Sequence, residues 1–153
     1  MLTINVPTVV DVWDETKEEF LSGEEIKVTM EHSLKAISEW ESRHHKHFLH
    51  NKDLTSEELA DYYRLMIVEP KTLTVNDFLR IIADSSTLEK IAKYVNDPYT
   101  ATTFSEAQKN SVKSNGLGRD IITAEIVYYW MVSLQIPFEC ENWNINKLLT
   151  LIQ

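Results

Sequence analysis

The sequence predicts an α+β fold that is mostly helical, with a small N-terminal β hairpin or sheet packed on about five helices. Two observations predict this class: the first residues are rich in β-branched side chains, and most of the remaining chain places apolar residues at helical spacing. In addition, 43% of the 153 residues are hydrophobic, which indicates a compact globular chain. A chain of this length is expected to form a single domain, residues 1–153, and to bury a core without a metal or a disulfide.

Two stretches near the N-terminus have the pattern of strands. Residues 2–10 contain three valines, two threonines and one isoleucine, and residues 25–30 alternate apolar with polar side chains. The acidic segment between them, residues 14–23, is expected to form one or two helical turns that end at Gly23.

Six later segments have the pattern of helices. In the first, Leu34, Ile37 and Trp40 recur at the spacing of an amphipathic helix. In the second, Thr55 and Glu58 have the spacing of a capping box. The expected helices cover approximately residues 32–46, 55–68, 75–83, 86–96, 120–135 and 144–152.

The helix expected over residues 120–135 is apolar on nearly all sides. Helices of this kind are normally buried, so we expect it at the centre of the fold, with Pro137 stopping it. The polar segment 105–118 ahead of it has no helical or strand period and holds two of the three glycines. We expect that segment to be an exposed loop.

The chain is acidic, with 24 Asp and Glu residues against 15 Lys and Arg residues and a formal net charge of −9. This charge disfavours nucleic acids and anionic membranes as partners. The sequence has no secretory signal pattern and no apolar run of the roughly 20 residues needed to cross a bilayer. Its single cysteine, Cys140, cannot form an intrachain disulfide. We therefore expect a cytosolic protein.

Four of the five histidines, His44, His45, His47 and His50, lie within seven positions. A zinc site usually draws at least three ligands that converge tetrahedrally, whereas each three-residue step along a helix turns the side chain by about 60°. Basic groups are also favoured at the C-terminal end of a helix by the helix dipole. We favour the helix end, and a metal-binding role for the His44–His50 cluster is kept as a third interpretation.

The sequence contains no pattern typical of a catalytic site. Gly116-Leu117-Gly118 lacks the third glycine and the lysine of nucleotide-binding loops. Glu31 and His32 precede a helix, but adjacency alone does not define an acid-base pair. We therefore expect a protein that is not an enzyme and has no cofactor.

Large aromatic residues are the remaining signal, because side chains of this size anchor either cores or interfaces. Tyr128, Tyr129 and Trp130 are consecutive, and on a helix they point in directions about 100° apart, so at least one should meet a partner or the rim of a groove. This much apolar surface also predicts a homo-oligomer. The candidate partner-binding residues are Trp40, Phe48, Tyr128, Tyr129, Trp130, Phe138 and Trp143.

Several stretches together resemble one protein family. They are EHSLKAISEWES and the following KHFL, then YTATTF, and then ITAEIVYYWMVSLQIPFECENWNINKLLTLI. They resemble the tail assembly chaperones of long-tailed, siphovirus-like bacteriophages, and the likeness covers most of the chain. Two positions depart from the family pattern: His47 stands where a proline is usual before Phe-Leu, and Thr103 stands where an aromatic residue is frequent.

The resemblance implies a non-enzymatic chaperone in the host bacterial cytoplasm. Such a protein binds the tape measure protein, keeps it soluble and assists polymerisation of the tail tube, so the implied partners are the tape measure protein and the tail tube protein. It also implies that this chain is the short form of a pair whose longer form arises by ribosomal frameshifting. The alternative is a structural virion component, such as a neck, tail or capsid accessory protein, whose apolar helices make permanent oligomer contacts.

Overall fold

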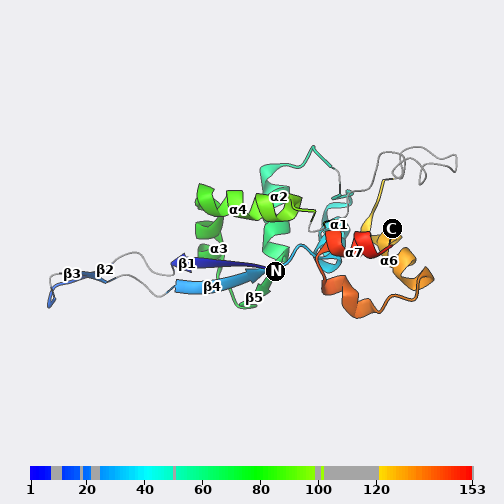
Figure 1. Cartoon of the computed structure of the whole chain (residues 1–153). Coiled ribbons are helices and arrows are strands. Elements are labelled where there is room, and N and C mark those ends of the chain that lie inside the picture. The colour runs from blue at the N-terminus through cyan, green and yellow to red at the C-terminus, as the bar shows by residue number, and fades with distance from the viewer. Residues whose placement is uncertain are drawn as a thin grey trace.

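The computed structural model describes residues 1–7, 12–17, 19–21, 25–49, 51–98, 101 and 121–152. Strands are concentrated before residue 31 and helices after it, which confirms the α+β class (Figure 1). In chain order, the elements are β1 (Leu2–Pro7), β2 (Val12–Asp14), β3 (Glu19–Leu21), β4 (Glu25–Met30), α1 (Leu34–His44), α2 (Ser56–Leu65), β5 (Ile67–Glu69), α3 (Val75–Ala83), α4 (Ser85–Asn96), α6 (Ala124–Ser133), the 3₁₀ helix η1 (Phe138–Asn142) and α7 (Ile145–Ile152).

The N-terminal strands form two separate antiparallel pairings. β4 lies between β1 and β5, and the β1–β4 register runs from Leu2 opposite Met30 to Pro7 opposite Glu25. β2 and β3 form a second ladder, which lies beyond the far ends of β1 and β4 (Figure 1). The prediction of helical turns over residues 14–23 is therefore wrong for the described part of that segment. Gly23 is not among the described residues. Valine, tryptophan and phenylalanine in these short strands favour β structure over the helix that was expected for this acidic segment.

The second helix is shorter than its sequence pattern predicts. α2 ends at Leu65, and the next residues leave it to form β5, in which Ile67 pairs with Met30. The backbone N–H of Glu31 donates to the carbonyl of Met66 at 2.9 Å. Pairing with the open edge of β4 therefore overrides the helical pattern of residues 66–68.

Local capping signals place the helix starts. Thr55 and Glu58 make both hydrogen bonds of the capping box, which confirms that expectation. Thr74 likewise accepts from the N–H of Asp77 at the start of α3. These caps satisfy backbone donors that the first helical turn leaves without partners.

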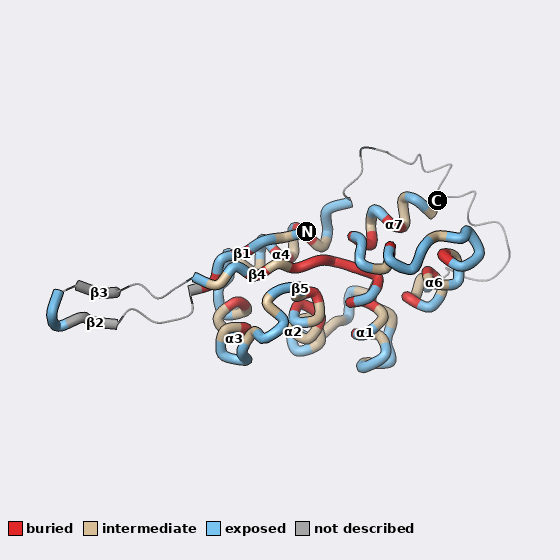
Figure 2. The backbone as a smooth tube through the Cα atoms, turned by 90° about the horizontal axis from the view of Figure 1, so that it is seen from below, coloured by how far each residue is buried: buried red, intermediate tan, exposed pale blue. Residues whose placement is uncertain are grey.

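The centre of the fold is α1 and the segment that leads into it, not α6. Residues 30–34 are all buried, and they form the continuous buried stretch between β4 and α1 in Figure 2. α1 packs against α2, α6 and η1, and its Ile37 and Trp40 are fully buried. The expectation of a central helix over residues 120–135 is wrong, because α6 buries one side only. The loop expected at residues 105–118 lies outside the described residues.

The helices of the fold stand along the sheet. In Figure 2, α3, α2 and α1 form a row beside β1 and β4, and α6 and α7 lie past α1 at the end opposite β2 and β3. Within the described ranges, no helix combines the length and the apolar character required to cross a membrane.

We predict that Trp40→Ala lowers the free energy of unfolding by about 3–5 kcal/mol, because it removes a fully buried ring and leaves a cavity. The substitution also removes the indole N–H that donates to the carbonyl of Glu58 at 2.8 Å. Urea denaturation measures the change. Lys35→Ala, at an exposed position of the same helix, should change stability by less than about 0.5 kcal/mol; equal stabilities of the two variants would contradict the packing described above.

Candidate partner-binding face

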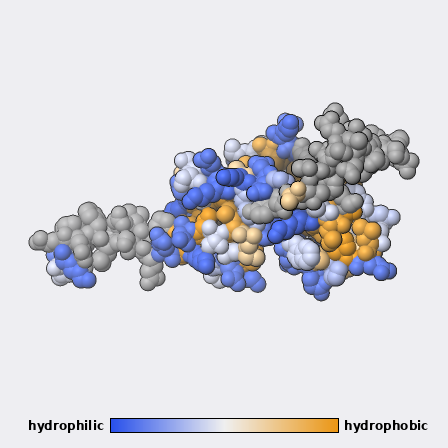
Figure 3. All heavy atoms as spheres, in the orientation of Figure 1, coloured by the Kyte–Doolittle hydropathy of each residue, from blue (hydrophilic) through white to orange (hydrophobic). Residues whose placement is uncertain are grey.

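Exposed apolar side chains gather on α6 and the residues that follow it. Figure 3 shows hydrophobic atoms over α6 and α7, bordered by hydrophilic ones. A typical soluble surface exposes large apolar residues singly, so a concentration of them is typical of an interaction surface. We define the α6–η1 face as five residues that are each about half exposed or more: Tyr129 (69%), Val132 (61%), Leu134 (54%), Phe138 (59%) and Trp143 (49%).

The helical period divides α6 into two apolar sides. Ala124, Val127 and Met131 are buried against the rest of the fold. Tyr129 and Val132 lie on the other side and are exposed. α6 is therefore apolar on two sides: one side packs into the core, and the other side is exposed.

A carboxylate fixes the start of α6 against the end of α1. Glu41 accepts from the backbone N–H of Ala124 at 2.8 Å and, through its other oxygen, from that of Phe48 at 2.9 Å. The side chain of Thr123 caps the helix by accepting from the N–H of Ile126. Charge-assisted bonds to a helix N-terminus of this kind are stronger than neutral ones, so α6 is held in a defined position.

The residues after α6 are tied back to it by the ring of Tyr128. Its hydroxyl donates to the carboxylate of Glu141 at 2.7 Å, and the ring lies 6.5 Å from that of Phe138, centroid to centroid. Partial burial and then the hydrogen bond to Glu141 raise the pKa of Tyr128, so the phenol remains protonated and continues to donate. This contact places Phe138 next to α6.

The last residue of the face is positioned by a polar cluster inside the fold. Trp143 precedes Asn144, which is buried and bridges to Ser33. The side-chain amide of Asn144 donates to Glu31 at 3.3 Å, and the N–H of Ile145 donates to the carbonyl of His32 at 2.7 Å. The start of α7 is therefore pinned to the link between β4 and α1.

Glu31 is the hub of that cluster. One carboxylate oxygen accepts from the hydroxyl of Tyr94 at 2.6 Å, from Asn144 and from the backbone N–H of His32 at 3.0 Å. The other lies 3.1 Å from the α-amino group of Met1. Burying a charge is unfavourable unless several hydrogen-bond donors surround it. The burial of Glu31 therefore depends on these partners.

His32 is buried beside Glu31 and is neutral at pH 7. Burial lowers its pKa from 6.5 to about 4, although the charge of Glu31 acts in the opposite direction. Its Nδ1 and the hydroxyl of Tyr62 are hydrogen-bonded, and burial raises the pKa of Tyr62 well above its ordinary value. Neither group therefore changes its charge near neutral pH, and the hydrogen bond between them persists.

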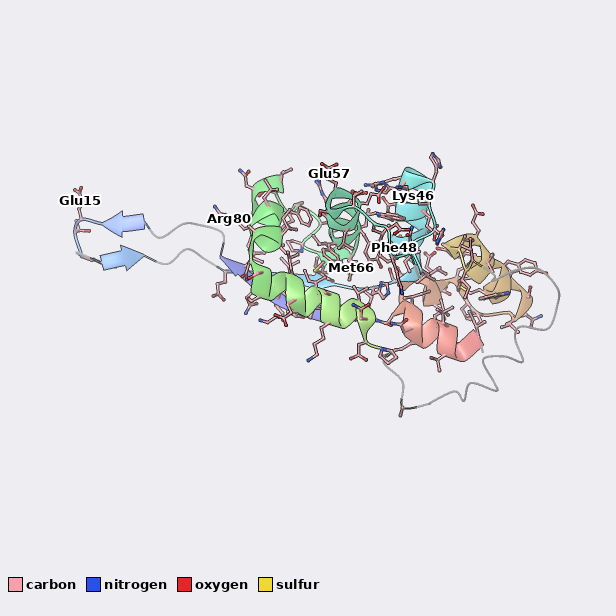
Figure 4. The ribbon with its side chains drawn as sticks, turned by 90° about the horizontal axis from the view of Figure 1, so that it is seen from above. Glu15, Lys46, Phe48, Glu57, Met66 and Arg80 are labelled. Carbon is pink, nitrogen blue, oxygen red and sulfur yellow. The ribbon has the colours of Figure 1, made fainter. Side chains whose placement is uncertain are left out.

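The structure places the expected partner-binding residues in two groups. Trp40 and Phe48 belong to the core, with exposed fractions of 0% and 7%, and Figure 4 shows Phe48 between α1 and α2. Their burial removes them from a partner-binding set. Tyr128 and Trp130 are partly buried, whereas Tyr129, Phe138 and Trp143 are exposed together with Val132 and Leu134, which the sequence interpretation did not single out.

The histidine cluster lies where helix α1 ends. The helix stops at His44, and His45 caps it in a left-handed conformation with φ of 54°. His44 stacks on Trp40 at 4.6 Å and bonds to Asp61 at 2.8 Å, and His47 offers its backbone carbonyl to Asn51. Each of these contacts stabilises the end of α1. No group of three or more metal-ligating side chains comes together among the described residues, to which His50 does not belong.

A polar groove of about 660 Å³ lies between the end of α1 and the start of α6. His45, His47 and Glu41 line it. Both oxygens of Glu41 already accept backbone N–H groups, so this carboxylate has a structural role rather than that of a general base.

Comparison of the chain with protein-family models, with curated proteins and with solved structures found no significant match.

We predict that Glu31→Gln lowers the free energy of unfolding by about 2–4 kcal/mol, because an amide cannot accept all the donors that converge on the carboxylate. Hydrogen exchange at Ile145 should become faster, since the start of α7 loses its anchor. Glu57→Gln, at an exposed position of α2, is the matched control. Equal stability of the two variants would show that the cluster does not hold the fold together.

We predict that stability falls as the pH is lowered from about 6.5 to about 4. In the folded protein His32 stays neutral over this range, because its pKa is about 4, whereas in the unfolded chain it takes up a proton near pH 6.5. The full effect of this group is about 3 kcal/mol. Urea denaturation at several pH values should give a flatter pH dependence for His32→Gln than for the parent chain; parallel curves would contradict the assignment.

Proposed function

We propose that the protein is a non-enzymatic chaperone for bacteriophage tail assembly, and that its α6–η1 face binds apolar helical segments of the tape measure protein. The single observation that carries the proposal is the exposure of Tyr129, Phe138 and Trp143 on a firmly anchored helix and its extension. Exposed aromatic residues at fixed positions are typical of binding hot spots. The resemblance of the sequence to tail assembly chaperones supplies the identity of the client.

Two physical properties support this role. Binding of an apolar helix requires apolar side chains on a rigid element, and α6 has its opposite side packed into the core. A chaperone that coats a long apolar client must also remain dispersed, and a net charge of −9 opposes association of the coated complexes. The exposed apolar face and the negative net charge therefore both support the proposed chaperone function.

The proposal predicts the outcome of co-expression with segments of the tape measure protein from the phage that encodes this chain. The parent chain should keep these segments soluble and should co-purify with them. The double variant Tyr129→Ser with Phe138→Ser should recover roughly tenfold less of the complex, because two exposed anchors are lost while the core is unchanged.

The matched control is Val75→Ser with Leu79→Ser. These residues of α3 are similarly exposed, at 56% and 50%, and α3 lies at the far end of the row of helices from α6 (Figure 2). If both double variants lose the client equally, or if the parent chain never retains it, the proposal fails. Mass spectrometry of purified phage particles is a further test, because a chaperone should be absent from them and a structural component present.

A further inference from the structure

The outer edge of β1 is a second surface that can bind a partner, and the proposed function does not use it. In the order β1-β4-β5 the strand β1 is an outer strand, and in Figure 2 it lies on the side of β4 away from the row of α3, α2 and α1. Within the described ranges, residues 2–6 make backbone pairings with β4 only. The N–H and C=O groups that point away from β4 are therefore available to a further strand.

The two edges of the sheet differ in how they resist a further strand. At the other edge, β5 has three residues, its pairing with β4 is irregular, and Glu69 and Pro70 stand at its end. Short length, irregular pairing, charge and proline all oppose association at an edge. β1 has six residues, pairs with β4 without interruption and contains no charged side chain. The β1 edge is therefore the better template for pairing.

We infer that β1 pairs with β1 of a second copy of this chain, antiparallel and centred on Ile4, so that two three-stranded sheets become one. In this register Leu2 lies opposite Val6 of the second copy, and Thr3 lies opposite its Asn5. Ile4 and Val6 are buried and Leu2 is half-buried, whereas Thr3 and Asn5 are exposed. Apolar residues thus meet apolar ones on the inner face of the joined sheet, and polar residues meet polar ones on the outer face.

Pro7 determines which register is favoured. Proline has no N–H to donate, so full pairing extends only as far as Val6. A centre on Ile4 uses all of residues 2–6 and leaves Pro7 opposite Met1, outside the ladder. A centre one residue further along would bring Pro7 opposite Thr3. The contact is isologous, because both copies use the same residues, and it closes as a dimer.

Charge favours a second copy as the occupant of this edge. A net charge of −9 opposes close approach of two copies over most of their surface. Residues 2–6 carry no charge, so their pairing brings no like charges together. A pairing of this length is at the small end of interface sizes, and we expect a dissociation constant on the order of micromolar.

The test is sedimentation velocity of the full chain from about 1 μM to about 100 μM, over which the parent chain should change from monomer to dimer. In Thr3→Glu with Asn5→Glu, glutamates of the two copies face one another, and the dissociation constant should rise roughly tenfold or more. The substitutions suit the sheet within one chain, because Asn5 pairs with Lys27 of β4 and Thr3 pairs with Thr29.

The matched control is Thr3→Lys with Asn5→Glu, which changes the same two positions. Here the lysine of each copy faces a glutamate of the other, so the control should form a dimer at least as tightly as the parent chain. Equal weakening of the dimer in both double variants would overturn the inferred register.

Hydrogen exchange of the parent chain tests the same edge without any substitution. Amides of residues 2–6 should exchange more slowly at about 100 μM than at about 1 μM, because pairing protects those that point outward. Amides of β5 should exchange at the same rate at both concentrations. Rates for residues 2–6 that do not depend on concentration would overturn the inference, whether or not the variants fold.

The same measurements distinguish other occupants of the two surfaces. A parent chain that remains monomeric over the whole range would overturn the inference. Loss of the dimer in Tyr129→Ser with Phe138→Ser, but not in Thr3→Glu with Asn5→Glu, would place the second copy on the α6–η1 face and would also overturn it. None of these outcomes involves the tape measure protein, so the chaperone proposal is tested separately.

Discussion

The carboxylate of Glu31 collects donors from residues that are as many as 113 positions away in the chain. Tyr94 reaches it from α4 and Asn144 from the start of α7, and the α-amino group of Met1 lies against its second oxygen. A buried charge is tolerated only while such donors remain in place, because its hydration has been lost. Glu31 thus requires the strands, α4 and α7 to be assembled at the same time, and it links the sheet to the helical end that carries the exposed aromatic residues.

A second carboxylate applies the same chemistry at shorter range. Glu41 accepts the N–H groups of Phe48 and Ala124, so the turn after α1 and the first residue of α6 are fixed by one side chain. Both carboxylates lie on or next to α1, whose Trp40 and Ile37 are buried at the centre. The α6–η1 face is consequently presented by a rigid support, which would reduce the entropy lost in the binding proposed above.

The sequence was most informative where structure is determined locally. The caps at Thr55 and Thr74 follow from hydrogen bonds that span three residues, and the α+β class follows from periodicity. Features that depend on distant partners were not predictable in this way. The residues around Ile67 give no sign that this segment pairs with the edge of β4. The residues around Glu31 likewise give no sign that Tyr94 and Asn144 donate to its carboxylate. The aromatic residues illustrate the same limit, since residue type alone does not distinguish a buried Trp40 from an exposed Trp143.

The division of α6 into two sides also has an evolutionary consequence. Ala124, Val127 and Met131 must keep their volumes to preserve the core, whereas Tyr129 and Val132 are released from that requirement by the geometry of the helix. Surface positions of α6 can therefore change without a penalty in folding. A lineage could retain the scaffold and alter the chemistry of this surface by changing two or three side chains.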